Sequence, residues 1–313
     1  MSGRRDAGAR WIEVRVTTSV PAAEAVGAAL HDLRIGGLVE ERFSSDRVLL
    51  RCYLPASRLS PAIIETLRTR IRGLKRYGID PRPARIARRV IAARGWATAW
   101  RAHVTPVRVG RLYVRPSWVR APHPPGLTVI AIDPGMAFGA GSHPSTQLCL
   151  RALQSYLRGY HASRRRGGPV VFDVGTGSGI LAIAAARLGA SRVWAVDNDP
   201  VAVAVARNNV KLNSVGARVR VVRGSGLDRA PGRADVILAN LVAETIVPLL
   251  GRTRMRLRPG GVFVGSGIVA GRLGDVERAA RMARLRSMRV LSRGEWRAVV
   301  YAPSAGTPRR RGR

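Results

Sequence analysis

The stretch PVVFDVGTGSGILAIAAARLGASRVWAVDNDP, residues 169–200, decides the fold of this chain. An apolar run is followed by closely spaced glycines, then by an alanine-rich segment that ends at Gly189, and then by a second apolar run that ends in Asp197. This order predicts a buried strand, a glycine loop, a helix and a second strand. Such a unit binds a nucleoside, because glycines let the backbone approach the ligand and an acid after the second strand accepts hydrogen bonds from ribose hydroxyls.

The glycine spacing favours one nucleoside over another. A dinucleotide-binding loop reads G-x-G-x-x-G, whereas here the third glycine comes one residue early and Ile180 takes its place. An acid, Asp173, also precedes Gly175 by two residues. The pattern D-x-G-x-G-x-G with a distal acid is that of S-adenosylmethionine-dependent methyltransferases, so this donor is favoured over NAD. Asp173, Gly175, Gly177 and Asp197 are therefore candidate donor-binding residues.

Further strands downstream extend this unit into a sheet. The segment 217–226 predicts a third strand, 255–268 a fifth, and 294–302 a last strand that closes the sheet. The fourth, ADVILANLVAE (234–244), delivers Asn240 at its carboxyl end, where ligands bind in an open α/β sheet. Two interpretations of Asn240 remain open: it lines the donor crevice, or it caps the helix that follows.

The first part of the chain predicts a separate domain. Strand and helix patterns alternate over residues 10–92 in the order β-α-β-β-α-β, which is the ferredoxin-like arrangement. Because this segment contains no catalytic motif, we expect a substrate-recognition domain. A linker helix carrying Trp96 and Trp100 is expected over 93–104, the catalytic domain over 105–302, and a disordered basic tail over 303–313.

Composition limits the class of protein. The 313-residue chain carries a net charge of +35, yet of its 54 basic residues only Lys75 and Lys211 are lysine. The charge therefore either reflects codon bias or draws the protein to RNA and ribosomes. No apolar run reaches the roughly 20 residues of a membrane span. Two distant cysteines, Cys52 and Cys149, make no disulfide framework, so a cytoplasmic location is expected.

Several motifs resemble those of a known family. They include IDPGMAFGAGSHPSTQLCL (132–150), DNDPVAV (197–203), ILANLVAE (237–244) and the late GEW (294–296). On these motifs the chain resembles the bacterial methyltransferases that modify the eleventh protein of the large ribosomal subunit. The resemblance implies a Rossmann-like class I S-adenosylmethionine-dependent methyltransferase domain behind the small ferredoxin-like domain.

The same resemblance assigns roles to single residues. It implies that Thr146, Gly175, Asp197 and Asn240 contact S-adenosylmethionine and that MAFGAGSHPST (136–146) is a loop over that donor. Within the loop, His143 has no second metal ligand at suitable spacing, so no metal site is expected and a helix-entry role is preferred.

The expected reaction is methyl transfer to lysine or α-amino groups of the ribosomal protein, with Asn240 as the catalytic residue that orients the amine. Three alternatives remain open: a lysine methyltransferase of another protein, a nucleic-acid methyltransferase, and a nucleoside- or RNA-binding module without catalysis. The absence of a D/N-P-P-Y motif at Asn240 argues against an adenine substrate.

Overall fold

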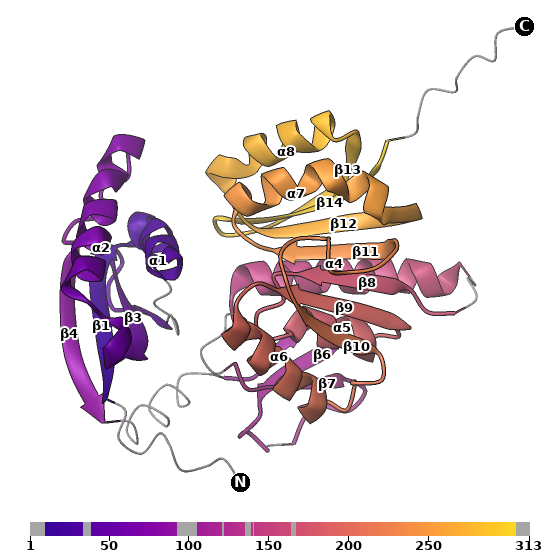
Figure 1. Cartoon of the computed structure of the whole chain (residues 1–313), viewed down its shortest axis with the longest axis horizontal. Helices are drawn as coiled ribbons and strands as arrows, with labels where there is room; N and C mark the ends of the chain where they lie inside the picture. The colour runs from indigo at the N-terminus through magenta and orange to yellow at the C-terminus, as the bar shows by residue number, and fades with distance from the viewer. Residues whose placement is uncertain are drawn as a thin grey trace, which may run out of the picture. The chain divides into compact units, whose positions relative to one another are not determined.

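The computed structural model describes residues 10–33, 39–92, 105–120, 122–134, 139, 141–163 and 167–304. They form two compact units, which divide between Val104 and Thr105. Figure 1 shows the helices and strands of both units. The expected linker helix with Trp96 and Trp100 and the part of the donor loop over 135–138 and 140 lie outside the described residues. The expected tail over 303–313 lies outside them from 305 onward, whereas Pro303 belongs to the last strand.

The first unit has the predicted ferredoxin-like order. Its helices and strands are β1 (Arg10–Ser19), α1 (Ala23–Asp32), β2 (Val39–Arg42), β3 (Arg47–Pro55), α2 (Pro61–Gly73) and β4 (Arg85–Ala92). The four strands form an antiparallel sheet in the order β2-β3-β1-β4. Alternate residues of β1 and β3, such as Val14, Val16 and Leu50, are fully buried among α1 and α2. This alternation of buried and more exposed side chains matches the apolar alternation in the sequence of these strands.

The second unit is built on a seven-stranded sheet. Its helices are α4 (Pro144–Ala162), α5 (Ile180–Arg187), α6 (Pro200–Leu212), α7 (Ala243–Arg256) and α8 (Leu273–Met282). Its strands are β5 (Val107–Val109), β6 (Leu112–Pro116), β7 (Thr128–Ile132), β8 (Val170–Val174), β9 (Arg192–Asp197), β10 (Val219–Arg223), β11 (Ala234–Asn240), β12 (Leu257–Val269), β13 (Leu285–Arg293) and β14 (Trp296–Pro303). The large sheet has the order β10-β9-β8-β11-β12-β14-β13, and β5-β6-β7 form a small sheet of their own.

Strand direction in the large sheet shows where a ligand can bind. The strands from β10 to β12 are parallel, whereas β14 runs antiparallel between β12 and β13. The order reverses between β8 and β11, because β9 and β10 lie on one side of β8 and the later strands lie on the other. A crevice therefore opens at the carboxyl ends of β8 and β11, the usual ligand site of such a sheet.

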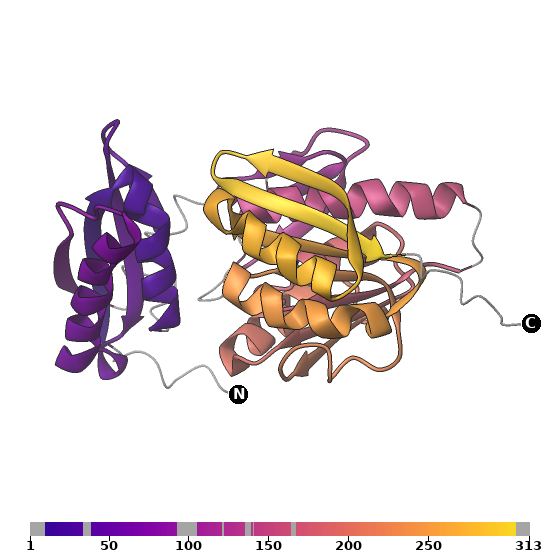
Figure 2. The same cartoon turned by 90° about the horizontal axis from the view of Figure 1, so that it is seen from above.

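Helices cover both faces of this sheet. The side chains of α4 and α5 share one hydrophobic core with β5, β6 and β7. A second core on the opposite face contains α7 and α8, which lie side by side (Figure 2). Coverage of both faces explains why β8 and β11 are nearly continuous apolar runs in the sequence.

The structure differs from the sequence prediction at the end of the sheet. The segment 294–302 does form a strand, β14, but it lies inside the sheet rather than at its edge. The edge strand is β13, which the sequence analysis did not predict, and neither did it predict α8. Most residues of β13 are exposed and several are arginine, so it lacks the apolar alternation on which a strand prediction depends. No helix in the described part of the chain is both long and apolar enough to span a membrane.

Candidate active site

The glycine loop between β8 and α5 is tied to the end of β9. The N–H groups of Gly175 and Thr176 both donate to the Val196 carbonyl, at 2.8 and 3.1 Å. The N–H of Gly177 donates to Asp197 Oδ2 at 2.9 Å. Gly175 has a φ of +72°, and a Cβ there would lie 2.4 Å from the Leu241 side chain. The loop therefore requires glycine at 175 both for its conformation and for its contact with the segment after β11.

Asp173 lies beneath this loop and is fully buried. Its Oδ2 accepts from the Thr176 hydroxyl at 2.6 Å and from the Ala182 N–H at 3.0 Å. Its Oδ1 is buried with no hydrogen-bond partner among the described residues. Burial raises the pKa of the Asp173 carboxyl to about 7, although both hydrogen bonds favour its charged form. Asp173 thus holds the loop onto the first turn of α5 through one oxygen and leaves the other unpaired.

Thr146 lies in the first turn of α4. The helix begins at Pro144, so the residues HPST are a helix start and the predicted loop ends earlier than expected. His143 is the N-cap residue, and its Nδ1 accepts from the Ser145 N–H. The helix-entry role predicted for His143 is therefore confirmed. Burial lowers the pKa of His143 to about 4, so its ring is neutral at neutral pH.

Asn240 and Thr146, which are 94 residues apart in sequence, meet at the carboxyl end of β11. The Asn240 Nδ2 donates to the Thr146 Oγ1 at 3.1 Å. The Asn240 Oδ1 is buried and has no partner among the described residues. Helix α7 has Val242 as its N-cap residue, so the alternative that Asn240 caps this helix is wrong. An unpartnered buried acceptor costs free energy unless a ligand group donates to it.

Ser266 and Trp296, near the end of the chain, contact the start of α4, although the sequence analysis does not predict them as site residues. Ser266, on β12, donates its hydroxyl to the Ser145 carbonyl at 2.9 Å. Trp296, the first residue of β14, packs edge-on against the His143 ring at 4.5 Å between ring centres. Trp296 belongs to the GEW motif (294–296), and Ser266 begins the sequence SGI (266–268); neither short sequence indicates by its composition that it contacts α4.

The segment before α4 is anchored to the glycine loop by a serine and an asparagine. Ser178 donates its hydroxyl to the Gly139 carbonyl at 2.7 Å. The side chain of Asn209, on α6, donates to the carbonyls of Ser178 and Asp133 and accepts from the Asp133 N–H. The described part of the loop over 133–142 is therefore attached directly to the glycine loop.

The predicted site residues are thus brought together at one end of the sheet. Gly175 and Gly177 lie in the loop after β8, where the Gly177 N–H is bonded to Asp197 at the end of β9, and Thr146 contacts Asn240 at the end of β11. Asp173 lies directly below the loop and does not line its surface. No group of three or more His, Cys, Asp or Glu side chains that could hold a metal occurs among the described residues.

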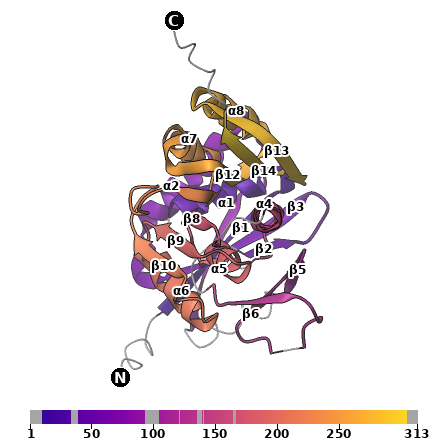
Figure 3. The ribbon, with the colours of Figure 1, turned by 90° about the vertical axis from the view of Figure 1, so that its right-hand side faces the viewer.

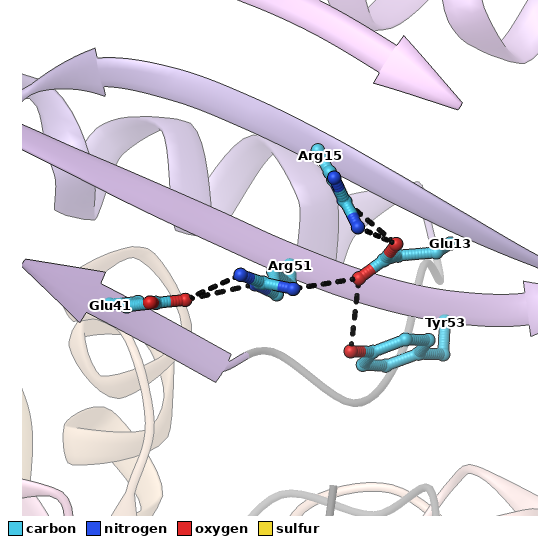
Figure 4. A network of polar contacts seen from close by, with 5 residues as sticks. All are labelled: Glu13, Arg15, Glu41, Arg51 and Tyr53. Atoms are coloured by element: carbon cyan, nitrogen blue, oxygen red, sulfur yellow. Dashed lines mark hydrogen bonds and ion pairs between the residues drawn. The ribbon is translucent and has the colours of Figure 1, made fainter. Parts of the chain in front are cut away.

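The first unit contains a polar network of its own, shown in Figure 4. Glu13, on β1, is almost fully buried and accepts from Arg15 at 2.8 Å, Tyr53 at 3.2 Å and Arg51 at 3.3 Å. Arg51 also pairs with Glu41 of β2. Burial would raise the pKa of Glu13, but the hydrogen bonds and charges of the arginines outweigh it, so its pKa is lowered. The network joins three adjacent strands and contains no nucleophile.

A parallel sheet with a glycine loop after β8, an acid ending β9 and an antiparallel β14 next to the edge defines a Rossmann-like class I methyltransferase. A family model supports this class and narrows it. The model described as ribosomal protein L11 methyltransferase (PrmA) matches residues 10–303, and the chain belongs to this family.

Similar proteins and a solved structure agree with this membership. The chain is 38% identical to the ribosomal protein L11 methyltransferase of Geobacillus kaustophilus over 93% of this chain and 98% of that protein. It is 37% identical to the corresponding protein of Pelotomaculum thermopropionicum, over the same shares of the two chains. A crystal structure of ribosomal protein L11 methylase from Lactobacillus delbrueckii subsp. bulgaricus has 29% identity and a TM-score of 0.57, and the match covers 64% of this chain and all of that one.

Proposed function

We propose that this protein transfers methyl groups from S-adenosylmethionine to lysine side chains or the α-amino group of ribosomal protein L11. The observation that carries the proposal is the buried Asn240 Oδ1, which has no partner among the described residues and lies beside Thr146 at the ligand-binding end of the sheet. Family membership supplies the reaction class, and the names of the relatives supply the substrate.

Four residues are suited to contact the donor, and a fifth, Asp173, shapes the loop around it. Asp197 ends β9 and can accept from the ribose diol, as such acids do in nucleoside-binding sheets. The backbone of Gly175 and Gly177 lets the ligand approach closely. Thr146 offers a hydroxyl to the methionine part of the donor, next to the Asn240 side chain. Asp173 contributes by fixing the shape of the loop, because its side chain is buried beneath it.

Asn240 is suited to orient the methyl acceptor. S-adenosylmethionine, when bound, supplies an electrophilic methyl group on a cationic sulfonium. A lysine amine attacks only when neutral, and its ordinary pKa is about 10.4. A crevice that excludes water, beside a positive charge, lowers the pKa of that amine. The free Asn240 Oδ1 can then accept a hydrogen bond from the amine and direct its lone pair, so placement supplies most of the rate.

The first unit is proposed to recognise the substrate protein, over residues 10–92, while residues 105–302 carry out the transfer. Its antiparallel sheet and internally paired Glu13 network form a stable surface without catalytic groups. A cytoplasmic location fits this substrate. The net charge of +35 is proposed to attract the protein toward RNA and ribosomes.

The test is intact-mass spectrometry of purified ribosomal protein L11 after incubation with the full chain and S-adenosylmethionine. Mass gains in steps of one methyl group are expected, and fragmentation then identifies the amines. If the donor binds but no mass gain occurs, L11 is not the substrate, and the substrate part of the proposal is wrong.

Two variants separate the proposed roles. Asn240→Ala removes the acceptor that orients the amine, so turnover is expected to fall about 100-fold or more while donor affinity changes little. Asp197→Ala removes the ribose acceptor and is expected to weaken donor binding first. Thr146→Val removes the hydroxyl proposed to contact the donor and its hydrogen bond with Asn240 but keeps the Asn240 Oδ1, so it is expected to weaken donor binding more than turnover. Equal losses of turnover and donor affinity in Asn240→Ala would make Asn240 a donor contact only.

A further inference from the structure

A groove of about 780 Å³ lies beside the first turns of α4, outside the crevice described above. Its lining comes from three elements: β5, α4 and β13. Figure 3 shows α4 nearly end on, with β13 on one side and β5 on the other. Both strands are sheet edges, since β5 pairs only with β6 and β13 only with β14.

Four arginines dominate the lining of this groove, and all four are exposed: Arg108, Arg151, Arg289 and Arg293. The lining includes no carboxylate, and none of the ion pairs among the described residues involves any of the four. Like charges on a shared surface repel one another unless an anion lies between them. The groove therefore favours an anionic ligand.

The distribution of the arginines favours a polyanion such as a nucleic-acid backbone. Guanidinium groups bind phosphate or carboxylate oxygens through two parallel hydrogen bonds. The four come from three separate elements, so a chain with regularly repeated charges can contact several of them at once. Among the described residues the lining holds no aromatic side chain on which a base could stack, so a nucleic acid would be held through its phosphates alone. We propose that this groove binds the phosphate backbone of RNA without regard to base sequence.

The groove is connected to the active site through one side chain. Arg293 donates to the Gln147 Oε1, and the Gln147 Nε2 donates to the Ser142 carbonyl at 2.8 Å. Gln147 directly follows Thr146 in the first turn of α4. RNA bound in the groove would therefore lie beside the proposed donor site, whichever protein accepts the methyl group.

The test is fluorescence anisotropy of a short labelled single-stranded RNA of mixed sequence, titrated with the full chain between 50 and 200 mM salt. The groove variant changes all four arginines to glutamine. The matched control changes four exposed arginines elsewhere in the same unit that also lack an ion pair: Arg187, Arg192, Arg220 and Arg233. Both variants lose the same net charge, so only the position of the charge differs.

The groove variant is expected to lower the slope of log K against log salt by about 3, since each phosphate contact contributes about 0.7 for a single strand. Over this salt range the parent should then lose about 50-fold more affinity than the groove variant. The double variant Arg108→Gln/Arg289→Gln should lower the slope by about half as much as the groove variant. It tests the same proposal if the quadruple variant does not fold.

Three outcomes would overturn the proposal. The control variant could lose as much slope as the groove variant, which would make the binding a general effect of charge. The groove variant could keep the parent slope. It could also lose binding to polyglutamate but not to RNA, which would identify a surface for acidic peptides. Methyl transfer by the parent is measured on the same preparation, so an inactive parent that still binds RNA refutes the proposed function alone.

Discussion

Asp173→Asn tests whether the active site holds a carboxyl that destabilises the fold. The folded-state pKa of Asp173 is about 7, above the value of 3.8 for an ordinary aspartate. The folded chain therefore holds this proton more tightly than the unfolded chain, and its stabilising effect is complete below pH 3.8 and is lost as pH rises through 7. Relative to the protonated group, the free energy of unfolding falls by about 2 kcal/mol at pH 5 and about 4 kcal/mol at pH 8.

Asparagine is neutral at both pH values and keeps one oxygen for the Thr176 hydroxyl and the Ala182 N–H. Its NH₂ group replaces the unpartnered Oδ1 and buries donors without acceptors, at a cost of about 1–3 kcal/mol. These two effects nearly cancel at pH 5. At pH 8 the variant is expected to be more stable than the parent by about 2 kcal/mol.

Urea unfolding of parent and variant at pH 5 and pH 8 gives the two differences directly, and titrations shared by both chains cancel. Thr176→Val serves as the opposite control. It removes a hydrogen bond that favours the charged carboxyl, so it should cost more stability at pH 8 than at pH 5. A difference between Asp173→Asn and the parent that is the same at both pH values would refute the assignment of a raised pKa to this buried group.

Three further predictions concern single positions. Gly175→Ala places a methyl group 2.4 Å from Leu241 at a φ of +72°, so it should lower the melting temperature by an amount equivalent to about 2 kcal/mol, whereas Gly216→Ala, in open space, should not. His143→Asn keeps a capping acceptor but removes a ring whose pKa burial lowers to about 4. In urea unfolding, the His143 ring should make the parent lose stability as pH falls from 6.5 to 4, and the variant should lack this loss. Glu13→Gln removes the carboxylate partner of Arg15 and leaves Arg51 paired with Glu41 alone, so it should cost the first unit about 2 kcal/mol at pH 7. This loss should shrink as pH falls through the lowered pKa of the parent carboxyl, and a loss constant with pH would contradict the pairing.

Local patterns in the sequence were sufficient for most of the fold. Helix α2 shows why: Ser60 accepts from the Ile63 N–H at its start, Pro61 follows, and Gly78 ends the turn beyond it in a left-handed conformation. Each of these signals acts over a few residues, so the sequence alone predicts it. Strand β13 lacks such a signal, because it is mostly exposed and its arginines replace the apolar alternation that predicts a strand.

The candidate site was predictable in its parts but not in its connections. The positions of Gly175 and Asp197 follow from the strand-loop-helix-strand pattern, which spans about 30 residues. The pairing of Asn240 with Thr146, and the contact of Trp296 with His143, depend on how the last strands join the sheet. These two contacts at the start of α4 join residues far apart in the sequence, so only the tertiary structure reveals them.

The start of α4 has a consequence for synthesis of the protein. Asn240 on β11, Ser266 on β12 and Trp296 on β14 all contact residues of this one helical turn. The hydrogen bonds among them span 94 and 121 residues of sequence. Contacts of such long range form late in folding. A nascent chain still held by the ribosome would have its glycine loop early, but the turn that carries Thr146 would lack its contact with Trp296 until the last strand emerges.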